Sequence, residues 1–332
     1  MKNARRASLR AALVVSILAA AAAAGLAPRL ASAQAWPEKP IRIVVGFPPG
    51  GAADQIARLV GQPLQEALGQ PVVVENRTGA GGNVAGDAVA KSAPDGYTLL
   101  MSSGGMVSVN PHIYAKMSFD PAKDLTPVAA AARVSVYLVV KPEFPAKNVA
   151  EFLAYAKANP GKLSYGSPGN GSSPHLAGEM MSSQAGLTTR HIPYRGAAPA
   201  LQDLLGGQID FLLDPGIALP QVQAGKLRLL AVGGLQRSPL YPDVPTLDES
   251  GLKGFDADTL FGFYAPSATP KPVIERLNAE INRILATKPV ADRIVALGGA
   301  TVPMTPAQFE AKARDDFQRF GAIIRERKIV GD

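Results

Sequence analysis

Short apolar runs alternate with longer amphipathic segments along most of the chain. The run Ile41–Val45 is rich in β-branched residues and leads into a turn with two prolines and two glycines. From about Ala52 to Leu68 the apolar residues recur at helical spacing, with a break expected near Gly61–Pro63. The alternation continues with a strand at Val72–Val74, a helix at Asn83–Lys91 and a strand at Tyr97–Met101. This order predicts an α/β unit, a parallel sheet with helices on both faces.

The same pattern restarts in the middle of the chain, after an extended run at Val134–Val140. A second extended run, Thr259–Ala265, precedes a helical tail. The elements expected between and after these runs are strands at Ser164–Gly166, His191–Tyr194, Ile209–Leu213 and Leu227–Val232, and helices at Val149–Ala158, Pro174–Gln184, Pro199–Leu205, Lys271–Thr287, Val290–Leu297 and Pro306–Arg327.

Two α/β units joined by two extended runs predict two lobes, each a mostly parallel sheet flanked by helices. We expect lobe 1 to comprise residues 34–135 and 262–332, and lobe 2 to comprise residues 136–261. The crossings between them fall near residues 134–140 and 259–265. A single large α/β domain is the alternative that the pattern leaves open.

The first 33 residues have the features of a secretory signal peptide. Basic residues crowd the first ten positions, an apolar run covers Ala11–Leu26, and Ala31-Ser32-Ala33 supplies the small residues of a cleavage site. We expect export to the periplasm and cleavage after Ala33. A retained anchor is the alternative, but the run is shorter than the roughly 20 apolar residues of a membrane-spanning helix. The pair Arg5-Arg6 leaves both the general and the twin-arginine export routes open.

The formal charge of +7 belongs mostly to that segment. Residues 1–33 hold five Lys/Arg and no acidic residue, so 29 basic and 27 acidic residues remain in the rest of the chain. A nearly neutral chain without basic clusters offers nothing for nucleic acid to bind. The sequence has no cysteine, which excludes disulfides, a cysteine nucleophile and the acylated cysteine of a lipoprotein.

Several loops that follow predicted strands suit an anion. The turn Phe47–Asp54 contains Gly50 and Gly51, lies at the carboxyl end of the first strand and opens a helix, where backbone N–H groups and the helix dipole favour negative charge. A plain tight turn is the alternative. The loop Gly79–Gly86 resembles a dinucleotide fingerprint but has Val84 where the third glycine belongs. A nucleotide site is therefore not expected.

Two later loops repeat this arrangement. Ser167–His175 offers small hydroxyl and amide groups after a strand, and Tyr194–Pro199 adds Arg195, whose fork of donors matches a carboxylate or else faces solvent. Asp214 ends another predicted strand, where it could contact a ligand or cap the next helix.

The sequence contains few features that would indicate an enzyme. The chain has no G-x-S-x-G motif, and its three histidines do not have metal-ligand spacing. We therefore expect no metal, no cofactor and no catalysis. A hydrolase that uses Ser173 and His175 remains the alternative, since spacing alone does not exclude the pair. His175 could otherwise cap its helix or form a hydrogen bond between the lobes.

Many segments together resemble the Bug-type proteins, the extracytoplasmic binding components of tripartite tricarboxylate transporters. They occur in the family's order and cover nearly all of the chain after residue 35. The matching segments are Trp36–Arg42, Phe47–Gly51, Glu75–Arg77, Gly79–Gly82, Pro94–Leu99, Tyr165–His175, His191–Gly196, Asp203–Gln208 and Pro242–Thr246.

The resemblance implies a two-lobed periplasmic binding protein, a type II-like Venus flytrap that closes on a small organic acid. Implied partners are the membrane permease subunits of such a transporter, and a monomer is expected. The implied ligand-binding residues are Gly50, Gly51, Ala52 and Ser103 in lobe 1, and Ser167, Asn170, Ser172, Gly196, Ala197 and Asp214 in lobe 2. Departures from the family pattern at Phe211–Pro215 and Phe261-Gly262 leave the identity of the acid open. A sensory protein that passes its ligand to a signalling receptor fits the sequence equally well.

Overall fold

The computed structural model describes residues 36–331. The predicted signal peptide and its cleavage after Ala33 therefore lie outside the described residues. From Lys39 onward the chain forms one compact unit that contains both of the sheets. Within the described range, no helix has the length and apolar character needed to cross a membrane.

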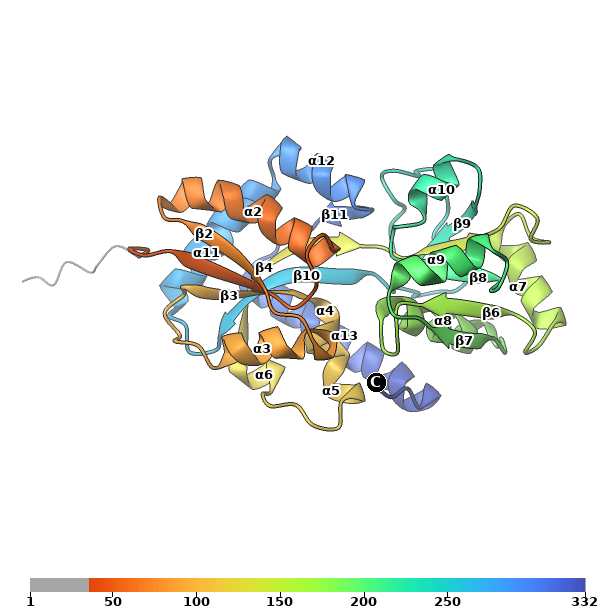
Figure 1. Ribbon diagram of the computed structural model, residues 1–332, viewed down its shortest axis with the longest axis horizontal. Helices are drawn as coiled ribbons and strands as arrows, with labels where there is room; N and C mark the ends of the chain where they lie inside the picture. Colours follow the sequence, from red (N-terminus) through yellow and green to blue (C-terminus); the bar gives the residue numbers. More distant parts are fainter. Residues whose placement is uncertain (1–35, 332) are drawn as a thin grey trace, which may run out of the picture. The chain divides into compact units, whose positions relative to one another are not determined.

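The first sheet has six strands in the order β11-β4-β10-β3-β1-β2 (Figure 1). Strand β1 runs parallel to β2 and β3, whereas β10 runs antiparallel to β3 and β4. Helices α2 and α3 cover opposite faces of this sheet. The strands are β1 (Ile41–Val45), β2 (Val72–Asn76), β3 (Thr98–Ser103), β4 (Leu125–Val134), β10 (Thr259–Pro266) and β11 (Gly299–Thr301).

The second sheet has five strands in the order β7-β6-β8-β5-β9. Strand β6 is parallel to β7 and β8, and β5 is antiparallel to β8 and β9. The strands are β5 (Tyr137–Val140), β6 (Ser164–Ser167), β7 (Arg190–Pro193), β8 (Phe211–Asp214) and β9 (Arg228–Val232).

Both sheets are mixed, so the expectation of mostly parallel sheets is wrong. Strand β11 pairs antiparallel with β4 at one edge of the first sheet, and the other antiparallel pairs involve the strands that pass between the sheets. Strand β5 follows directly from β4 of the first sheet, and β10 brings the chain back after β9 of the second. Each of these two strands enters a sheet from the other sheet and pairs antiparallel to both of its neighbours. The expected single run at Val134–Val140 is likewise two strands, β4 and β5, separated by residues 135–136.

The helices follow most of the predicted amphipathic segments. Those predicted are α2 (Ala52–Leu68), α3 (Asn83–Ala90), α7 (Val149–Ala158), α8 (Ser173–Ala185), α9 (Ala197–Leu205), α11 (Lys271–Leu285), α12 (Lys288–Ala296) and α13 (Pro306–Arg327). Not predicted are the 3-10 turn η1 (Ala80–Gly82) and the short helices α4 (Gly104–Ser108), α5 (Asn110–Ile113), α6 (Pro121–Asp124) and α10 (Leu219–Gln223).

Helix α2 is continuous, so the break expected near Gly61–Pro63 is wrong. Val60 and Leu64 on either side of the proline are fully buried. A Cβ atom on Gly61 would lie 3.4 Å from Val72 of β2, so the helix packs closely on the sheet at this point. Burial of this face outweighs the lost backbone hydrogen bond at Pro63.

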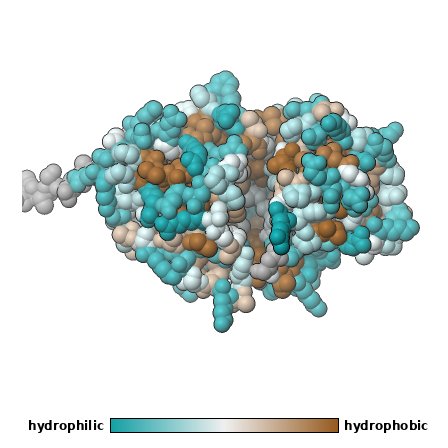
Figure 2. All heavy atoms as spheres, in the orientation of Figure 1, coloured by the Kyte–Doolittle hydropathy of each residue, from teal (hydrophilic) through white to brown (hydrophobic). Residues whose placement is uncertain are grey.

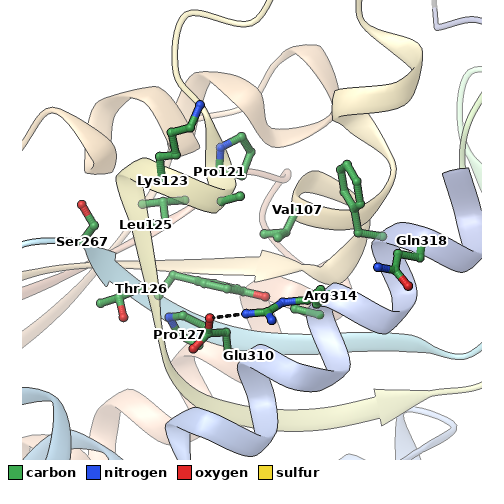
Figure 3. A pocket seen from close by; sticks show the side chains of 14 residues that line it. Val107, Pro121, Lys123, Leu125, Thr126, Pro127, Ser267, Glu310, Arg314 and Gln318 are labelled. Atoms are coloured by element: carbon green, nitrogen blue, oxygen red, sulfur yellow. Dashed lines mark hydrogen bonds and ion pairs between the residues drawn. The ribbon is translucent and has the colours of Figure 1, made fainter.

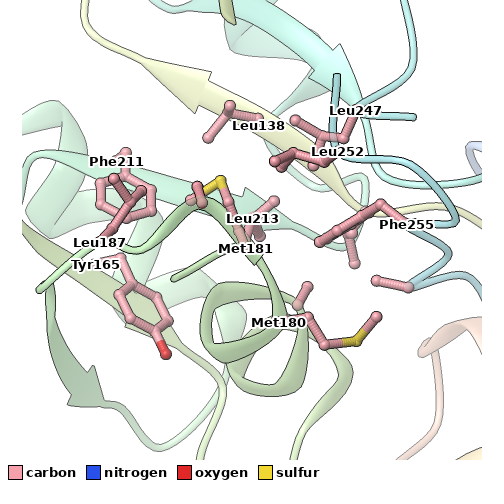
Figure 4. Packing of buried hydrophobic residues seen from close by; sticks show 14 of the residues in the cluster. Leu138, Tyr165, Met180, Met181, Leu187, Phe211, Leu213, Leu247, Leu252 and Phe255 are labelled. Carbon is pink, nitrogen blue, oxygen red and sulfur yellow. The ribbon is translucent and has the colours of Figure 1, made fainter. Parts of the chain in front are cut away.

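A large apolar core lies against the second sheet (Figure 4). Phe211 stacks on Tyr165 with ring centroids 5.3 Å apart. The C-terminal helix α13 adds Phe320, Ile323 and Ile324 to this core, although its earlier turns pack on β4 and α4 of the first sheet. Figure 2 shows hydrophilic residues over much of the face in view, with hydrophobic residues in smaller patches.

Candidate functional site

The first group of predicted site residues lies at the carboxyl ends of two paired strands. Gly50, Gly51 and Ala52 connect β1 to α2, and Ser103 is the last residue of β3. Strands β1 and β3 are parallel neighbours. All four residues therefore lie at the same edge of the first sheet, where open α/β sheets bind ligands.

The turn after β1 is held by a buried carboxylate. The Gly50 N–H donates to Asp54 at 2.9 Å, and Arg58 and the Asn76 amide also contact this carboxylate at 2.9 Å. Burial alone would raise the pKa of Asp54, but these hydrogen bonds outweigh it and lower the pKa. Gly50 adopts a φ of 83°, a conformation that favours glycine. Because its N–H is already used, the amides at the start of α2, beginning with Ala52, are the ones left for a ligand.

The second group of predicted residues lies at the carboxyl ends of β6, β7 and β8. Ser167 ends β6, Ala197 begins α9 after β7, and Asp214 ends β8. These three residues line one small cavity of about 10 Å³, close to the minimum for a single water molecule. Asn170 and Ser172 belong to the loop between β6 and α8, and Gly196 immediately precedes α9.

The hydroxyl groups of the β6–α8 loop stabilise the loop itself. Ser167 donates to the Gly169 carbonyl at 3.0 Å and contacts His191 Nε2 at 2.6 Å. Ser172 donates to the same carbonyl at 2.7 Å. Because the side chains of Ser167 and Ser172 are engaged inside the loop, mainly their backbone groups remain available to contact a ligand.

Two histidines support this loop: His175, which the sequence placed at its end, and His191, which the sequence did not associate with it. The rings of His175 and His191 are stacked with centroids 3.7 Å apart. His175 Nδ1 accepts a hydrogen bond from the Gly171 N–H at 3.0 Å, so this ring atom carries no proton. The sequence indicated this pair only weakly: His175 lies just after the loop that follows β6, and His191 lies in the neighbouring strand β7.

The geometry does not favour the alternative Ser173–His175 hydrolase pair. The Ser173 hydroxyl accepts a hydrogen bond from Thr259 at 2.6 Å. The Nδ1 atom of His175 is used by the Gly171 amide. Over residues 36–331, moreover, no group of three side chains is arranged to hold a metal ion.

Asp214 both caps a turn and keeps one oxygen without a protein partner. Its Oδ2 atom accepts from the N–H groups of Gly216 at 2.6 Å and Ala218 at 2.8 Å. Its Oδ1 atom is buried and has no hydrogen-bond partner within the described part of the chain. Burial raises the pKa of this carboxyl to about 6, although the two amide hydrogen bonds act to lower it. Arg195, by contrast, is exposed.

Two residues near the start of α8, which packs on the second sheet, contact residues of β10 and α5, which belong with the first sheet. Thr259, at the start of β10, bonds to Ser173 at the start of α8. Gly171 lies so close to Ile113 of α5 that a Cβ atom there would be 2.3 Å from the isoleucine side chain. A cavity of about 520 Å³ lies elsewhere, beside β4 and α13, and none of the predicted site residues lines it.

Comparison with known proteins identifies the family. Residues 56–329 match the model of the tripartite tricarboxylate transporter family receptor. The chain is 39% identical over 308 residues to the protein BugT of Bordetella pertussis, an alignment that covers 92% of this chain and 94% of BugT.

Solved structures agree with this assignment. A Rhodopseudomonas palustris protein solved with adipate has a TM-score of 0.79 at 32% identity, covering 90% of this chain and all of that one. MatC of the same organism, with bound malate, has a TM-score of 0.74 at 32% identity, covering 87% and 100%. The resemblance seen in the sequence is thereby confirmed and the hydrolase alternative is rejected. The chain belongs to the tripartite tricarboxylate transporter receptor family, whose members are extracytoplasmic solute-binding proteins and not enzymes.

Proposed function

We propose that this receptor closes on a small organic acid between two lobes, residues 34–135 with 262–332 and residues 136–261. The crossings near 134–140 and 259–265 serve as the hinge. The observation that carries the proposal is the position of the helix-opening loops, which lie at the carboxyl edge of each sheet. The acids bound by two structural relatives, adipate and malate, support a carboxylate ligand.

In this proposal backbone amides hold the carboxylate. Lobe 1 contributes the α2 start and the end of β3, and lobe 2 contributes the starts of α8 and α9. Helix N-termini favour an anion without needing a cationic side chain. The residues concerned are Ala52, Ser103, Ser167, Asn170, Ser172, Gly196 and Ala197. Gly50 and Gly51 form the turn that presents the α2 amides to the acid.

Asp214 has a different role in this site. Its unpartnered Oδ1 atom is an acceptor when ionised, and a second negative charge beside it is unfavourable. We propose that Asp214 accepts a hydrogen bond from a hydroxyl or a protonated carboxyl of the acid, and so selects among carboxylates of similar length.

The ligand favours the closed form because it makes all of its contacts only when both lobes meet. The mature chain, cleaved after Ala33, acts as a monomer in the periplasm and delivers the acid to the membrane permease subunits of a tripartite tricarboxylate-type transporter. X-ray scattering tests this closure. The radius of gyration of the protein should fall when an acid that is known to bind is added. An unchanged scattering curve with a verified ligand would contradict the closure.

A substitution at Gly51 tests the site. Gly51 is exposed and has a φ of −71°, so Gly51→Leu introduces no backbone strain but fills the space in front of the α2 amides. We expect the affinity for captured acids, measured by native mass spectrometry and calorimetry, to fall at least tenfold.

The matched control is Gly206→Leu. Gly206 is also exposed, has a φ of −76°, and lies at the C-terminal end of α9, away from the proposed amides. Its affinity should equal that of the unchanged protein. Equal affinities in both variants would exclude the α2 amides from the site, and a chain that binds no acid at all would remove the carboxylate proposal.

A further inference from the structure

A cavity of about 520 Å³ lies beside β4 and α13. This volume is within the range of small-molecule binding sites. Its lining comes only from residues 107–127, 264–267 and 310–318. It is therefore separate from the carboxyl-edge loops and does not require any residue of the second sheet.

Its walls are mainly apolar and partly flat. Val107, Leu125 and Pro127 line it from α4 and the start of β4, and Phe317 lines it from α13 (Figure 3). The Phe317 ring packs against His112 at a tilt of 41°, with ring centroids 4.1 Å apart. Proline and phenylalanine faces suit a planar apolar body.

One residue that lines this cavity, Tyr264, has a buried hydroxyl without a partner. Tyr264 is only 2% exposed, and its hydroxyl makes no hydrogen bond to any part of the chain between residues 36 and 331. Its neighbour in β4 is Pro127, which has no N–H to offer. The ring packs on Phe309 with centroids 5.0 Å apart. Since buried hydroxyls are nearly always paired, the one on Tyr264 indicates a polar atom of a ligand.

The rim carries a cation with free donors. Arg314 pairs with Glu310 at 2.8 Å, and Figure 3 shows the two side chains directed toward each other. The pair is well exposed and uses only part of the guanidinium, which has five N–H donors. Lys123 also lines the cavity, but its ammonium pairs with Asp120 at 2.8 Å.

We propose that this cavity is a second binding site, which takes a hydroxylated aromatic carboxylate. The carboxylate binds Arg314 at the rim, the ring lies between the proline and phenylalanine faces, and the hydroxyl bonds to Tyr264 inside. Because this site uses no carboxyl-edge residue, it binds its ligand independently of the transported acid.

The test uses hydroxybenzoates and hydroxynaphthoates together with the same acids lacking the hydroxyl. In fluorescence and calorimetric titrations, Tyr264→Phe should weaken the hydroxylated acids about tenfold and leave the others unchanged. Ala313→Trp should fill the cavity and abolish binding of both. The matched control, Ala311→Trp, changes an exposed alanine of the same helix that does not line the cavity and should bind normally.

Binding to Gly51→Leu distinguishes this second site from the carboxyl-edge site. In Gly51→Leu, the aromatic acids should bind with unchanged affinity, whatever happens to the other acids. Each variant is first checked for an unchanged circular dichroism spectrum and a cooperative unfolding transition. The proposal is overturned if no aromatic acid binds, if Ala313→Trp and Ala311→Trp bind alike, or if a crystal grown with the acid shows water alone at Tyr264.

Discussion

Among single residues, Asp214 couples the candidate site to pH. Burial raises the pKa of its carboxyl to about 6, from an ordinary value of 3.8. The folded chain therefore takes up this proton at a higher pH than the unfolded chain does. The stabilisation from that proton is fully present below about pH 4 and is lost as the pH rises through 6, a change of about 3 kcal/mol.

Asp214→Asn should remove this part of the pH dependence. We expect the free energy of unfolding of the variant, measured with urea and no ligand, to decline less between pH 4 and 7 than that of the unchanged chain. The control Asp243→Asn changes an exposed carboxylate and should keep the original profile. Identical profiles for Asp214→Asn and the unchanged chain would show that the carboxyl does not titrate in this window.

The sequence placed candidate residues at the carboxyl ends of strands but did not indicate the direction of their side chains. Ser167 and Ser172 were selected partly for their hydroxyls, yet both hydroxyls bond to the Gly169 carbonyl. The Gly169 carbonyl comes within reach of both hydroxyls only when the loop has folded. The stacked pair His175–His191 depends on the register of neighbouring strands, which no local pattern specifies.

Among the elements, helix α2 contains a proline, and the packing of the helix has to offset the free-energy cost of the missing backbone hydrogen bond. Pro63 lies well inside the helix and cannot supply the N–H that the Leu59 carbonyl would otherwise accept. We expect Pro63→Ala to raise the free energy of unfolding by about 2 kcal/mol, since the regained hydrogen bond exceeds the added freedom of the unfolded chain. Urea denaturation at neutral pH measures the change.

The control for this prediction is Pro306→Ala. Pro306 is the first residue of α13, where a missing N–H has no cost. Its replacement should change the stability little or lower it slightly. An equal gain in both variants would show that the effect does not come from the regained helix hydrogen bond, because only Pro63→Ala can restore one.

How well an element could be predicted depended on local signals. Helix α13 has the bounds that the sequence predicted, and its start is fixed locally, because Thr305 and Gln308 form a capping box and Pro306 follows the cap. Strand β4 was missed because its centre, Ala129–Ala132, consists of alanines, which prefer helices when isolated. The strand forms because β10 pairs along its whole length, and all four alanines are fully buried. Such long-range pairing leaves no periodic trace.

In the whole molecule, one arginine links the two crossings. Arg133 near the end of β4 forms an ion pair with Asp258 at 2.8 Å, just before β10. It also donates to Gln236 after β9 at 2.9 Å. The sequence predicts the two crossing ranges from their extended runs. It did not indicate that β5 and β10 enter antiparallel or that α13 reaches the second core, since both follow from contacts distant in sequence.

This arginine should be most important at neutral pH. Burial and the nearby Asp256 raise the pKa of Asp258 to about 6, and Arg133 opposes that rise. Without Arg133 the pKa rises further, and an ionised Asp258 is left buried and unpaired. We therefore expect Arg133→Met to lower the free energy of unfolding by about 3 kcal/mol at pH 7.

The loss should shrink as the pH falls toward 4, well below the folded pKa of about 6, because the folded Asp258 is then protonated both in the variant and in the unchanged chain. Adding Asp258→Asn should restore most of the stability at pH 7, because the unpaired charge is then absent. Arg237→Met, which breaks the exposed pair with Glu249, serves as the control and should cost less than about 1 kcal/mol at either pH. If Arg133→Met were as harmful at pH 4 as at pH 7, its effect would be one of packing, and the stability of the chain would not depend on this charge pair.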